Sequence, residues 1–277
     1  MSHEAQITRG NPTAFLFVVD QSGSMSDRMS IGKSKSEFVA DALNRTLMNL
    51  VGRATRSDGV RDYFEIGVIG YGGRGVDNGF SGALGSRVMN PISAIEQNPT
   101  RVEDRKKKMD DGAGGVIETS VKFPVWFEPR ADGGTPMRAA LAKAAEELAA
   151  WCDAHPESYP PTVLHVTDGE SGDGDPEEIA SGLAQLSTKD GSVVVMNIHV
   201  SALASDTIKF PGSESGLPDN HAKLLFRMSS ALPPQMATFA KDKGYNVSPE
   251  SRGYMFNAEA GEIVDFFDIG TRASQLR

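Results

Sequence analysis

The chain has 277 residues, of which 39% are apolar and 23% charged, so it can bury a sizeable core and is too apolar to be disordered. Its formal net charge of −9 argues against a broad nucleic-acid-binding surface and against adsorption to an anionic membrane. The single cysteine, Cys152, excludes an internal disulfide and a zinc site of several cysteines. Because the first ten residues contain Glu4 and no apolar segment, and no early apolar run could span a membrane, we expect a cytoplasmic protein.

The first part of the chain predicts a strand, a helix and a second strand. Residues 1–12 are polar and are expected to form a flexible start. The continuous apolar, β-forming run 13–19 is typical of a strand buried on both faces. Apolar residues then recur at helical spacing over 38–51, and a second buried strand is expected over 63–71.

Residues 72–134 break this pattern. We expect them to form an elaborated insertion at the ligand-bearing edge, because long ordered loops are often functional. Short strands are expected at 116–123 and 125–128. The run 101–111 holds five basic and four acidic residues and is interpreted as a solvated charged face.

The remainder of the chain returns to alternating helices and strands. The expected elements are a helix over 137–151, a strand over 162–167, a helix over 176–186, a strand over 192–200, a loop over about 205–221, a helix over 234–243, a strand over 252–257 and a helix over 262–272. This order predicts an α/β fold over 13–272, with a mostly parallel sheet and helices on both faces.

Oxygen-bearing side chains stand where predicted strands and helices meet. Asp20, Ser22 and Ser24 form D-x-S-x-S after the first strand, and Asp168 follows the strand 162–167. Thr135 directly precedes the helix 137–151. In an open parallel sheet, ligands bind beyond the carboxyl ends of the strands, so we expect these five residues to converge.

This set of ligands predicts a particular cation and a particular role. Hard oxygens with few carboxylates suit Mg²⁺, tolerate Mn²⁺ and suit Ca²⁺ less, because calcium usually takes more carboxylate oxygens. Two carboxylates roughly neutralise a divalent cation, so an open coordination position would attract a carboxylate from another molecule. The sequence therefore predicts a metal-dependent protein–protein contact with a partner that offers Asp or Glu.

Three segments in order, DQSGSM at 20–25, GGTPM at 133–137 and VTDGE at 166–170, resemble the metal-ion-dependent adhesion site of the von Willebrand factor A (VWA) family. The resemblance covers about residues 13–270. It implies a Rossmann-like, doubly wound sheet of about six strands between two helical layers. It also implies that Asp20, Ser22, Ser24, Thr135 and Asp168 are the metal-site residues and that the metal mediates binding rather than turnover.

Because no signal or disulfide is visible, the chain is more similar to intracellular bacterial members of that family, including tellurite-resistance-type proteins. Some of these are associated with protein kinases, type 2C phosphatases or MoxR-like AAA+ ATPases in stress or phage-defence settings. The resemblance therefore implies a regulatory or stress-response complex with such a partner.

Other interpretations stay open. The segment 20–24 is also typical of a turn, and Thr135 before Pro136 of a helix N-cap. Asp20 could instead be the nucleophile of a Mg²⁺-dependent phosphohydrolase, although the second acid of such enzymes is replaced here by Ser22. A metal-free scaffold is a third alternative. We expect no enzyme, because no catalytic constellation is complete.

Three further groups are interpreted as structural. His165 and His199 are expected to be hydrogen-bonded core residues, since both lie in predicted buried strands. Cys152 is expected to be a small buried apolar residue. The segment Asp173-Gly-Asp175 lacks the spaced acids of a calcium loop and is interpreted as helix capping.

Overall fold

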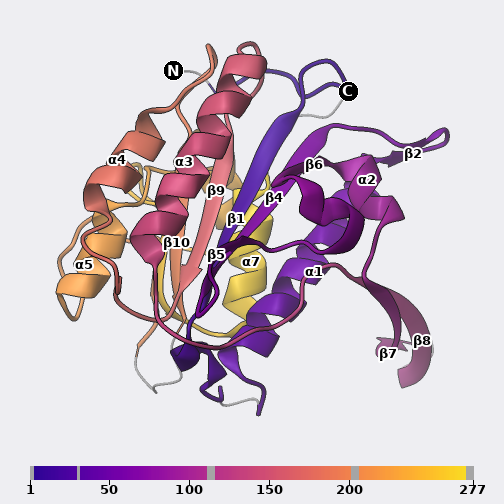
Figure 1. Cartoon of the computed structure of the whole chain (residues 1–277), viewed down its shortest axis with the longest axis horizontal. Coiled ribbons are helices and arrows are strands. Elements are labelled where there is room, and N and C mark those ends of the chain that lie inside the picture. Colours follow the sequence, from indigo (N-terminus) through magenta and orange to yellow (C-terminus); the bar gives the residue numbers. More distant parts are fainter. Residues whose placement is uncertain (1–2, 30–31, 111–115, 201–205, 273–277) are drawn as a thin grey trace.

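The fold is built on a central sheet, shown in the computed structural model of Figure 1, which describes residues 3–29, 32–110, 116–200 and 206–272. Its strand order is β11-β12-β10-β9-β1-β4-β5, and β6 also pairs with β4. The strands of this sheet are β1 (Thr13–Gln21), β4 (Phe64–Gly72), β5 (Gly75–Asn78), β6 (Met89–Pro91), β9 (Thr162–Thr167), β10 (Val194–Val200), β11 (Ile208–Lys209) and β12 (Tyr254–Ala258).

The predicted α/β class with a mostly parallel sheet is confirmed. Strands β12, β10, β9, β1 and β4 run parallel, and β5, β6 and β11 pair antiparallel at the two sides. The described sheet therefore has eight strands, and the expected number of six is not confirmed. The three antiparallel strands are only two to four residues long and carry no continuous apolar run, so hydrophobic patterning could not reveal them.

The apolar sequence of β1 explains its central place. All nine of its residues are buried, and alternate side chains point to opposite faces of the sheet. Phe15 and Phe17 belong to one core cluster and Leu16 and Val18 to the other. A strand with apolar side chains on both faces is stable only when helices cover both faces, as they do here.

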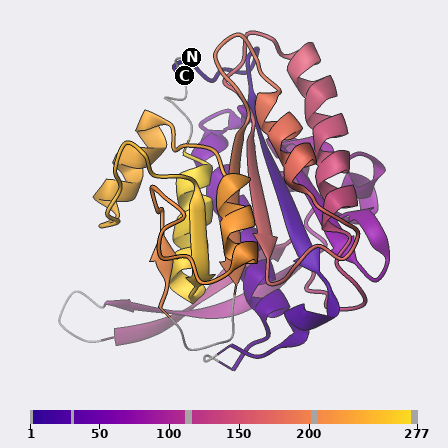
Figure 2. The ribbon, with the colours of Figure 1, turned by 90° about the vertical axis from the view of Figure 1, so that its left-hand side faces the viewer.

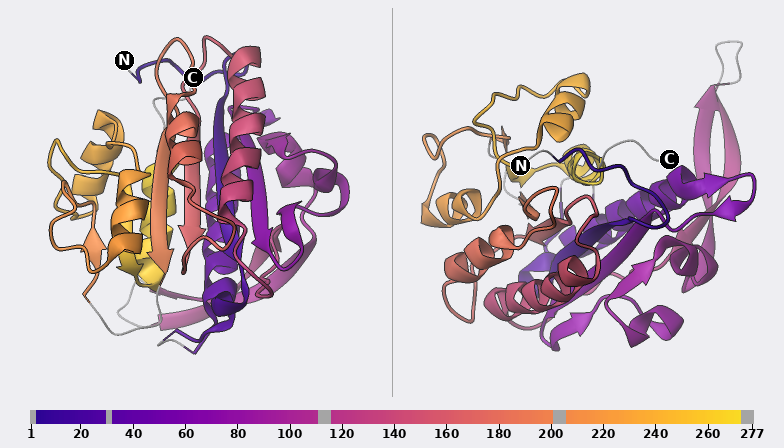
Figure 3. Two further views of the ribbon diagram at one scale, coloured as in Figure 1. Left: turned by 60° about the vertical axis from the view of Figure 1, so that its left-hand side comes forward. Right: turned by 90° about the horizontal axis from the view of Figure 1, so that it is seen from above.

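Helices cover the sheet in two layers. Figure 2 shows α7 on one side of the strands and α3 on the other, and the right-hand view of Figure 3 places α4 and α5 on the side of α3, with which they share a core cluster. The described helices are α1 (Lys35–Ala54), α2 (Ile92–Gln97), α3 (Met137–Ala154), α4 (Glu177–Gln185), α5 (Asn220–Arg227), α6 (Pro234–Asp242) and α7 (Ala260–Gly270). Short elements complete the chain: the 3-10 helices Gly23–Ser26 and Gly82–Ser86, and the strand pair β2 (Thr55–Arg56) and β3 (Gly59–Val60).

Within the predicted insertion, a long antiparallel ribbon leaves the body of the molecule. It consists of β7 (Arg101–Asp110) and β8 (Val116–Val125) and points upward at the right-hand edge of the right-hand view of Figure 3. The run interpreted as a solvated charged face is therefore largely a strand, and the two short strands expected at 116–128 are one strand that ends at Val125. Residues 111–115 lie outside the described residues.

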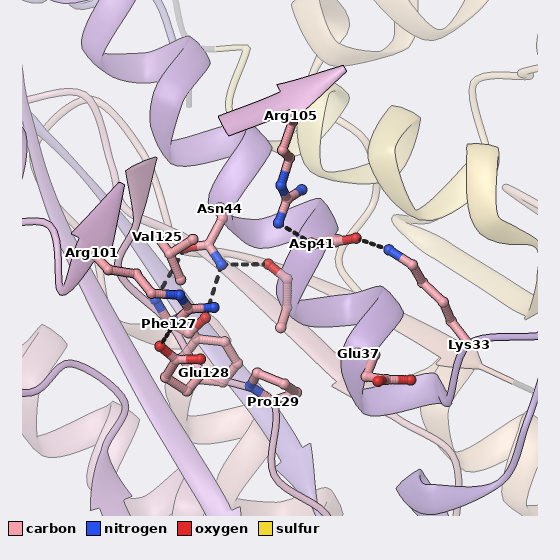
Figure 4. A pocket seen from close by; sticks show the side chains of 11 residues that line it. Lys33, Glu37, Asp41, Asn44, Arg101, Arg105, Val125, Phe127, Glu128 and Pro129 are labelled. Carbon is pink, nitrogen blue, oxygen red and sulfur yellow. Dashed lines mark hydrogen bonds and ion pairs between the residues drawn. The ribbon is translucent and has the colours of Figure 1, made fainter. Parts of the chain in front are cut away.

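The root of this ribbon is fixed to α1 by polar contacts (Figure 4). Arg105 donates to Asp41 at 2.9 Å. The buried Asn44 side chain accepts from the amides of Trp126 and Phe127 at 2.8 and 3.0 Å, and donates to the Phe127 carbonyl at 2.8 Å. These bonds satisfy main-chain groups at the point where β8 ends, so α1 sets the position of the ribbon.

The segments expected to be irregular also contact the body. Glu4 and Ala5, in the predicted flexible start, donate their amides to the Asp190 carboxylate, while residues 1–2 lie outside the described residues. In the predicted loop 205–221, β11 pairs with β12 and α5 begins at Asn220, while residue 205 lies outside the description. Across the described residues, no helix combines the length and the apolarity that crossing a membrane requires.

Candidate functional site

The carboxyl ends of β1 and β9 lie side by side and carry the predicted D-x-S-x-S segment and the predicted Asp168. Strand β1 pairs in parallel with β4 on one side and with β9 on the other. Asp20 is 1% exposed and its Oδ1 accepts from the Ser22 amide at 2.8 Å. This local bond turns the chain out of the strand and into the 3-10 helix that contains Ser24.

Hydrogen bonds connect four of the five predicted residues, with Asp20 joined to Ser22 through the Ser22 main-chain amide and the others joined through their side chains. Thr167 Oγ1 donates to Asp20 Oδ2 at 2.8 Å, which ties the end of β9 to the end of β1. The hydroxyl oxygens of Ser22 and Ser24 are 3.1 Å apart. Ser24 Oγ donates to Asp168 Oδ1 at 2.7 Å. Asp20, Ser22, Ser24 and Asp168 are therefore brought together, as the sequence predicts.

The loop that carries Thr135 packs against the end of β1. Gly23 donates to the Gly133 carbonyl at 3.0 Å, and Asp132 donates to the Gln21 carbonyl at 2.8 Å. Gly133 has φ +65°, and a Cβ there would lie 2.2 Å from Gly73 Cα, so only glycine allows this close approach. The loop thus reaches the site through its backbone.

Thr135 itself is placed by its main chain. Its carbonyl accepts from the amides of Gly172 and Met137, both at 2.8 Å, which holds it beside the segment that follows β9. The alternative interpretation of Thr135 as an N-cap is wrong, because the residue before α3 is Pro136 and no side-chain cap is made there. The Asp173 carboxylate caps α3 instead, accepting from the amides of Arg138 and Ala139 at 2.9 and 2.8 Å. The segment 173–175 therefore does cap a helix, but the helix is α3 and not the α4 helix that follows it, where Asp175 accepts only from the Glu177 amide and no side-chain cap is made.

Burial gives the Asp20 carboxylate an unusual electrostatic environment. Desolvation raises the pKa of Asp20, hydrogen bonds from Ser22 and Thr167 oppose this rise, and the nearby Asp168 carboxylate adds to it. Among the described residues, the hydrogen bonds that favour ionised Asp20 are therefore outweighed by its burial. A bound cation would supply a compensating charge.

Lys35 is the site residue that the sequence interpretation missed. It begins α1, its side chain is only 7% exposed, and its Nζ lies 2.8 Å from Asp168 Oδ2. The same Nζ lies 3.1 Å from Asp27 Oδ2 and 3.4 Å from the Ser24 carbonyl. The signal in the sequence was a lysine in the first helical turn, because the positive helix end disfavours a cation there.

The donor set fits a hard divalent cation. The four connected residues offer carboxylate and hydroxyl oxygens and neither thiolate nor imidazole, which is the chemistry of Mg²⁺ and Mn²⁺ sites with several water ligands. Within the described part of the chain, no group of three or more His, Cys, Asp or Glu residues could hold a metal ion. A cation here would accordingly depend on two carboxylates, on hydroxyls and on water.

A buried polar chain supports the floor of the site. Tyr71, which is opposite Asp20 in the pairing of β1 and β4, lies 2.7 Å through its hydroxyl from His165 Nε2. His165 Nδ1 lies 2.8 Å from Asn197 Oδ1, so the expectation of a hydrogen-bonded core histidine is confirmed. His199 differs, because its buried Nδ1 has no partner among the described residues and its ring stacks on Phe256.

Comparisons with known proteins bear on the fold. No protein-family model matches the chain, and no curated protein matches it. Its fold is similar to that of the pilus adhesin SpaC from Lactobacillus rhamnosus GG, with a TM-score of 0.52, 13% identity, and coverage of 95% of this chain and 31% of that chain. Manganese-loaded TRAP protein from Plasmodium vivax matches at TM-score 0.40 and 14% identity, over 93% of this chain and 72% of that one. The minor pilin PilB from Streptococcus sanguinis matches at a TM-score of 0.43 and 12% identity, over 93% of this chain and 60% of that chain.

These findings correct the family assignment made from the sequence. The prediction that the chain is an intracellular bacterial member of the VWA family is wrong, because the solved structure that its fold resembles at a TM-score of 0.52 is a pilus adhesin. The same finding contradicts the expected cytoplasmic location and the expected stress-response and tellurite-resistance associations. The kinase, phosphatase and ATPase partners rested on that family and lose its support.

Proposed function

We propose that this chain binds a divalent cation at the carboxyl ends of β1 and β9 and uses it to bind a protein partner through an Asp or Glu of that partner. The observation that carries the proposal is the chain of hydrogen bonds that joins Asp20, Ser22, Ser24 and Asp168. We infer further that the sheet is doubly wound in the Rossmann manner, because β4 and β9 flank β1 on opposite sides and the crevice forms where the winding reverses.

Each residue has a defined part in this proposal. Asp20 and Asp168 supply the two negative charges, and the hydroxyls of Ser22 and Ser24 supply neutral oxygens, with Thr135 assigned beside them. Mg²⁺ is the first choice and Mn²⁺ the second. When bound, the cation would offer its remaining coordination positions to water or to a carboxylate. Ser24 is exposed, so the site opens outward on its side.

The geometry favours binding over catalysis. Both oxygens of Asp20 accept hydrogen bonds, and the residue is 1% exposed, so an incoming phosphoryl group has no open line of attack on its carboxylate, whereas a cation can be held beside it through a water ligand. A nucleophilic carboxylate needs access along its line of attack. SpaC, to which the fold is similar, is by its name an adhesin, which agrees with a binding role.

Metal binding is the first test. We expect the wild-type chain to bind Mn²⁺ in a titration followed by electron paramagnetic resonance of free Mn²⁺, and Asp20→Asn to weaken binding by about tenfold or more, because it removes one of two charged ligands. Asp242→Asn is the matched control, since it removes the same charge from an exposed surface position. Equal Mn²⁺ affinity in all three proteins would refute the proposed site.

Partner binding is the second test. Immobilised wild-type chain, Ser22→Ala and Asp242→Asn are exposed to the same extract with Mg²⁺ or with a chelator. We expect a bound protein that is retained by the wild type and Asp242→Asn, is lost in Ser22→Ala and is released by the chelator. If the bound protein is retained in the presence of the chelator and also by Ser22→Ala, the metal-free scaffold is favoured.

A further inference from the structure

Lys35 occupies an unusual position for a lysine. Its side chain is 7% exposed although lysine is rarely buried, and it stands at the first position of α1, where the helix dipole repels a cation. The helix start is otherwise regular, because Ser34 and Glu37 form a reciprocal capping box. Helix formation therefore does not explain the lysine.

The ion pair with Asp168 does explain it. The Asp168 side chain is fully buried, and Lys35 Nζ lies 2.8 Å from its Oδ2. The other oxygen, Oδ1, accepts from Ser24 at 2.7 Å. A buried carboxylate without a counter-charge is costly, so Lys35 neutralises the same group that the proposed function assigns to the cation.

Lys35 also has a second partner. Asp27 Oδ2 lies 3.1 Å from Nζ, and the Asp27 side chain is 60% exposed. The ammonium thus lies between a buried acid of the site and an exposed acid outside it. A small movement of the flexible lysine stem would leave it paired with Asp27 alone.

We propose that Lys35 is a built-in counter-cation that competes with the divalent metal ion for Asp168 and thereby lowers the affinity of the site for metal. This inference rests on the proposed function. Exposed Asp27 is left out of the charge sum because water screens it, so the buried carboxylates of Asp20 and Asp168 and the ammonium of Lys35 sum to −1. Adding a divalent cation brings the sum to +1, and one partner carboxylate returns it to zero.

This charge balance predicts coupling between metal and partner. Metal alone leaves an excess of positive charge beside a buried ammonium, which disfavours tight binding. Metal together with an acidic side chain of a partner leaves no excess. Because such coupling is reciprocal, the partner should tighten metal binding by the factor by which the metal tightens partner binding.

Charge-removing variants test the competition directly. Lys35→Met keeps most of the apolar stem and removes the charge, Lys35→Gln removes the charge but keeps a hydrogen-bond donor for Asp168, and Lys35→Arg keeps the charge. Mn²⁺ alone is the probe, and its dissociation constant and the Tm with and without Mn²⁺ are measured. We expect Mn²⁺ to bind Lys35→Met and Lys35→Gln about tenfold or more tightly than wild type, and Lys35→Arg no more tightly.

Stability gives a second readout. Without metal, Lys35→Met should have a lower Tm than wild type, because Asp168 loses its counter-charge, and Mn²⁺ should raise that Tm by more than it raises the wild-type Tm. Where Lys35→Met does not fold without metal, Lys35→Gln supplies the comparison. The double variant Lys35→Gln/Asp20→Asn should lose the gain in affinity.

The outcomes separate this inference from the proposed function. If the wild type binds Mn²⁺ and the neutral variants bind it equally or more weakly, the competition is overturned while the metal site stands. A gain that persists in the double variant arises elsewhere and also overturns the competition. If neither the wild type nor the neutral variants bind Mn²⁺, both proposals fail.

Discussion

His165 is fully buried beneath the candidate site, and its protonation couples stability to pH. Burial lowers the pKa of His165 to about 4 in the folded protein. The unfolded chain keeps a value of about 6.5, so it takes up a proton first as the pH falls. The stabilising contribution of neutral His165 is therefore complete above about pH 6.5 and is lost as the pH falls toward 4.

We expect the wild-type free energy of unfolding to fall by about 2 kcal/mol more than that of His165→Gln between pH 7 and pH 5. Urea titrations at both pH values measure this difference, and equal denaturant slopes would show that the same structure unfolds in each. Glutamine is chosen because it can still bond to Tyr71 and Asn197 without titrating. Parallel pH dependence in the two proteins would contradict the assignment.

Single residues also show where sequence reasoning succeeds and where it stops. Asp20, Ser22, Ser24 and Asp168 were predicted to converge because the ends of adjacent parallel strands must meet at one edge. Lys35 was not predicted, because its contact with Asp168 leaves no periodic pattern and its one signal, a lysine in the first turn of a helix, does not say which acid it pairs with. The unpartnered Nδ1 of His199 was missed because a position in a buried strand does not show whether a partner for the ring lies nearby.

At the scale of elements, Asn44 on α1 holds Trp126 and Phe127, the two residues that directly follow β8. Its side chain donates to the carbonyls of Ala40 and Phe127 and accepts from two amides (Figure 4). We expect Asn44→Leu to lower the free energy of unfolding by roughly 3 kcal/mol, because buried main-chain groups lose their partners. Denaturant titration measures the loss.

The control for Asn44→Leu is Asn98→Ala. Asn98 also donates to the carbonyl four residues before it, at 2.8 Å, but it is exposed, so water can replace that bond. We expect a loss within about 0.5 kcal/mol there. Comparable losses in the two variants would mean that burial at Asn44 contributes little.

Elements with a long apolar signal were predicted well, and elements without one were not. The run 162–167 matches β9 residue for residue, and the stripe 137–151 lies within α3. By contrast, β7 carries no apolar run because it pairs with β8 alone, and the side chains that the structure describes there, those of residues 101–106, are exposed or only partly buried. The α5 helix was missed because its eight residues follow a loop rich in Gly, Pro and Ser.

At the scale of the whole molecule, the two core clusters and the ribbon differ in how they are stabilised. The clusters lie on the two faces of one sheet and share its strands, so they are expected to unfold together. The described outer part of the ribbon pairs with itself instead: Lys106 with Glu118, and Lys122 with Asp104. An isolated two-stranded ribbon contributes little to stability in water.

Shortening the ribbon therefore tests whether the body and its candidate site are independent of it. Residues 106–120 are replaced by Asn-Gly, which joins the paired Arg105 and Val121 and keeps the contact of Arg105 with Asp41. We expect the free energy of unfolding to change by less than about 1 kcal/mol and the Mn²⁺ affinity to stay within about twofold of wild type, because the site lies at the ends of β1 and β9. A loss as large as that expected for Asn44→Leu would show that the outer ribbon packs on the body. A loss of Mn²⁺ binding without a loss of stability would place a ligand of the cation in the ribbon.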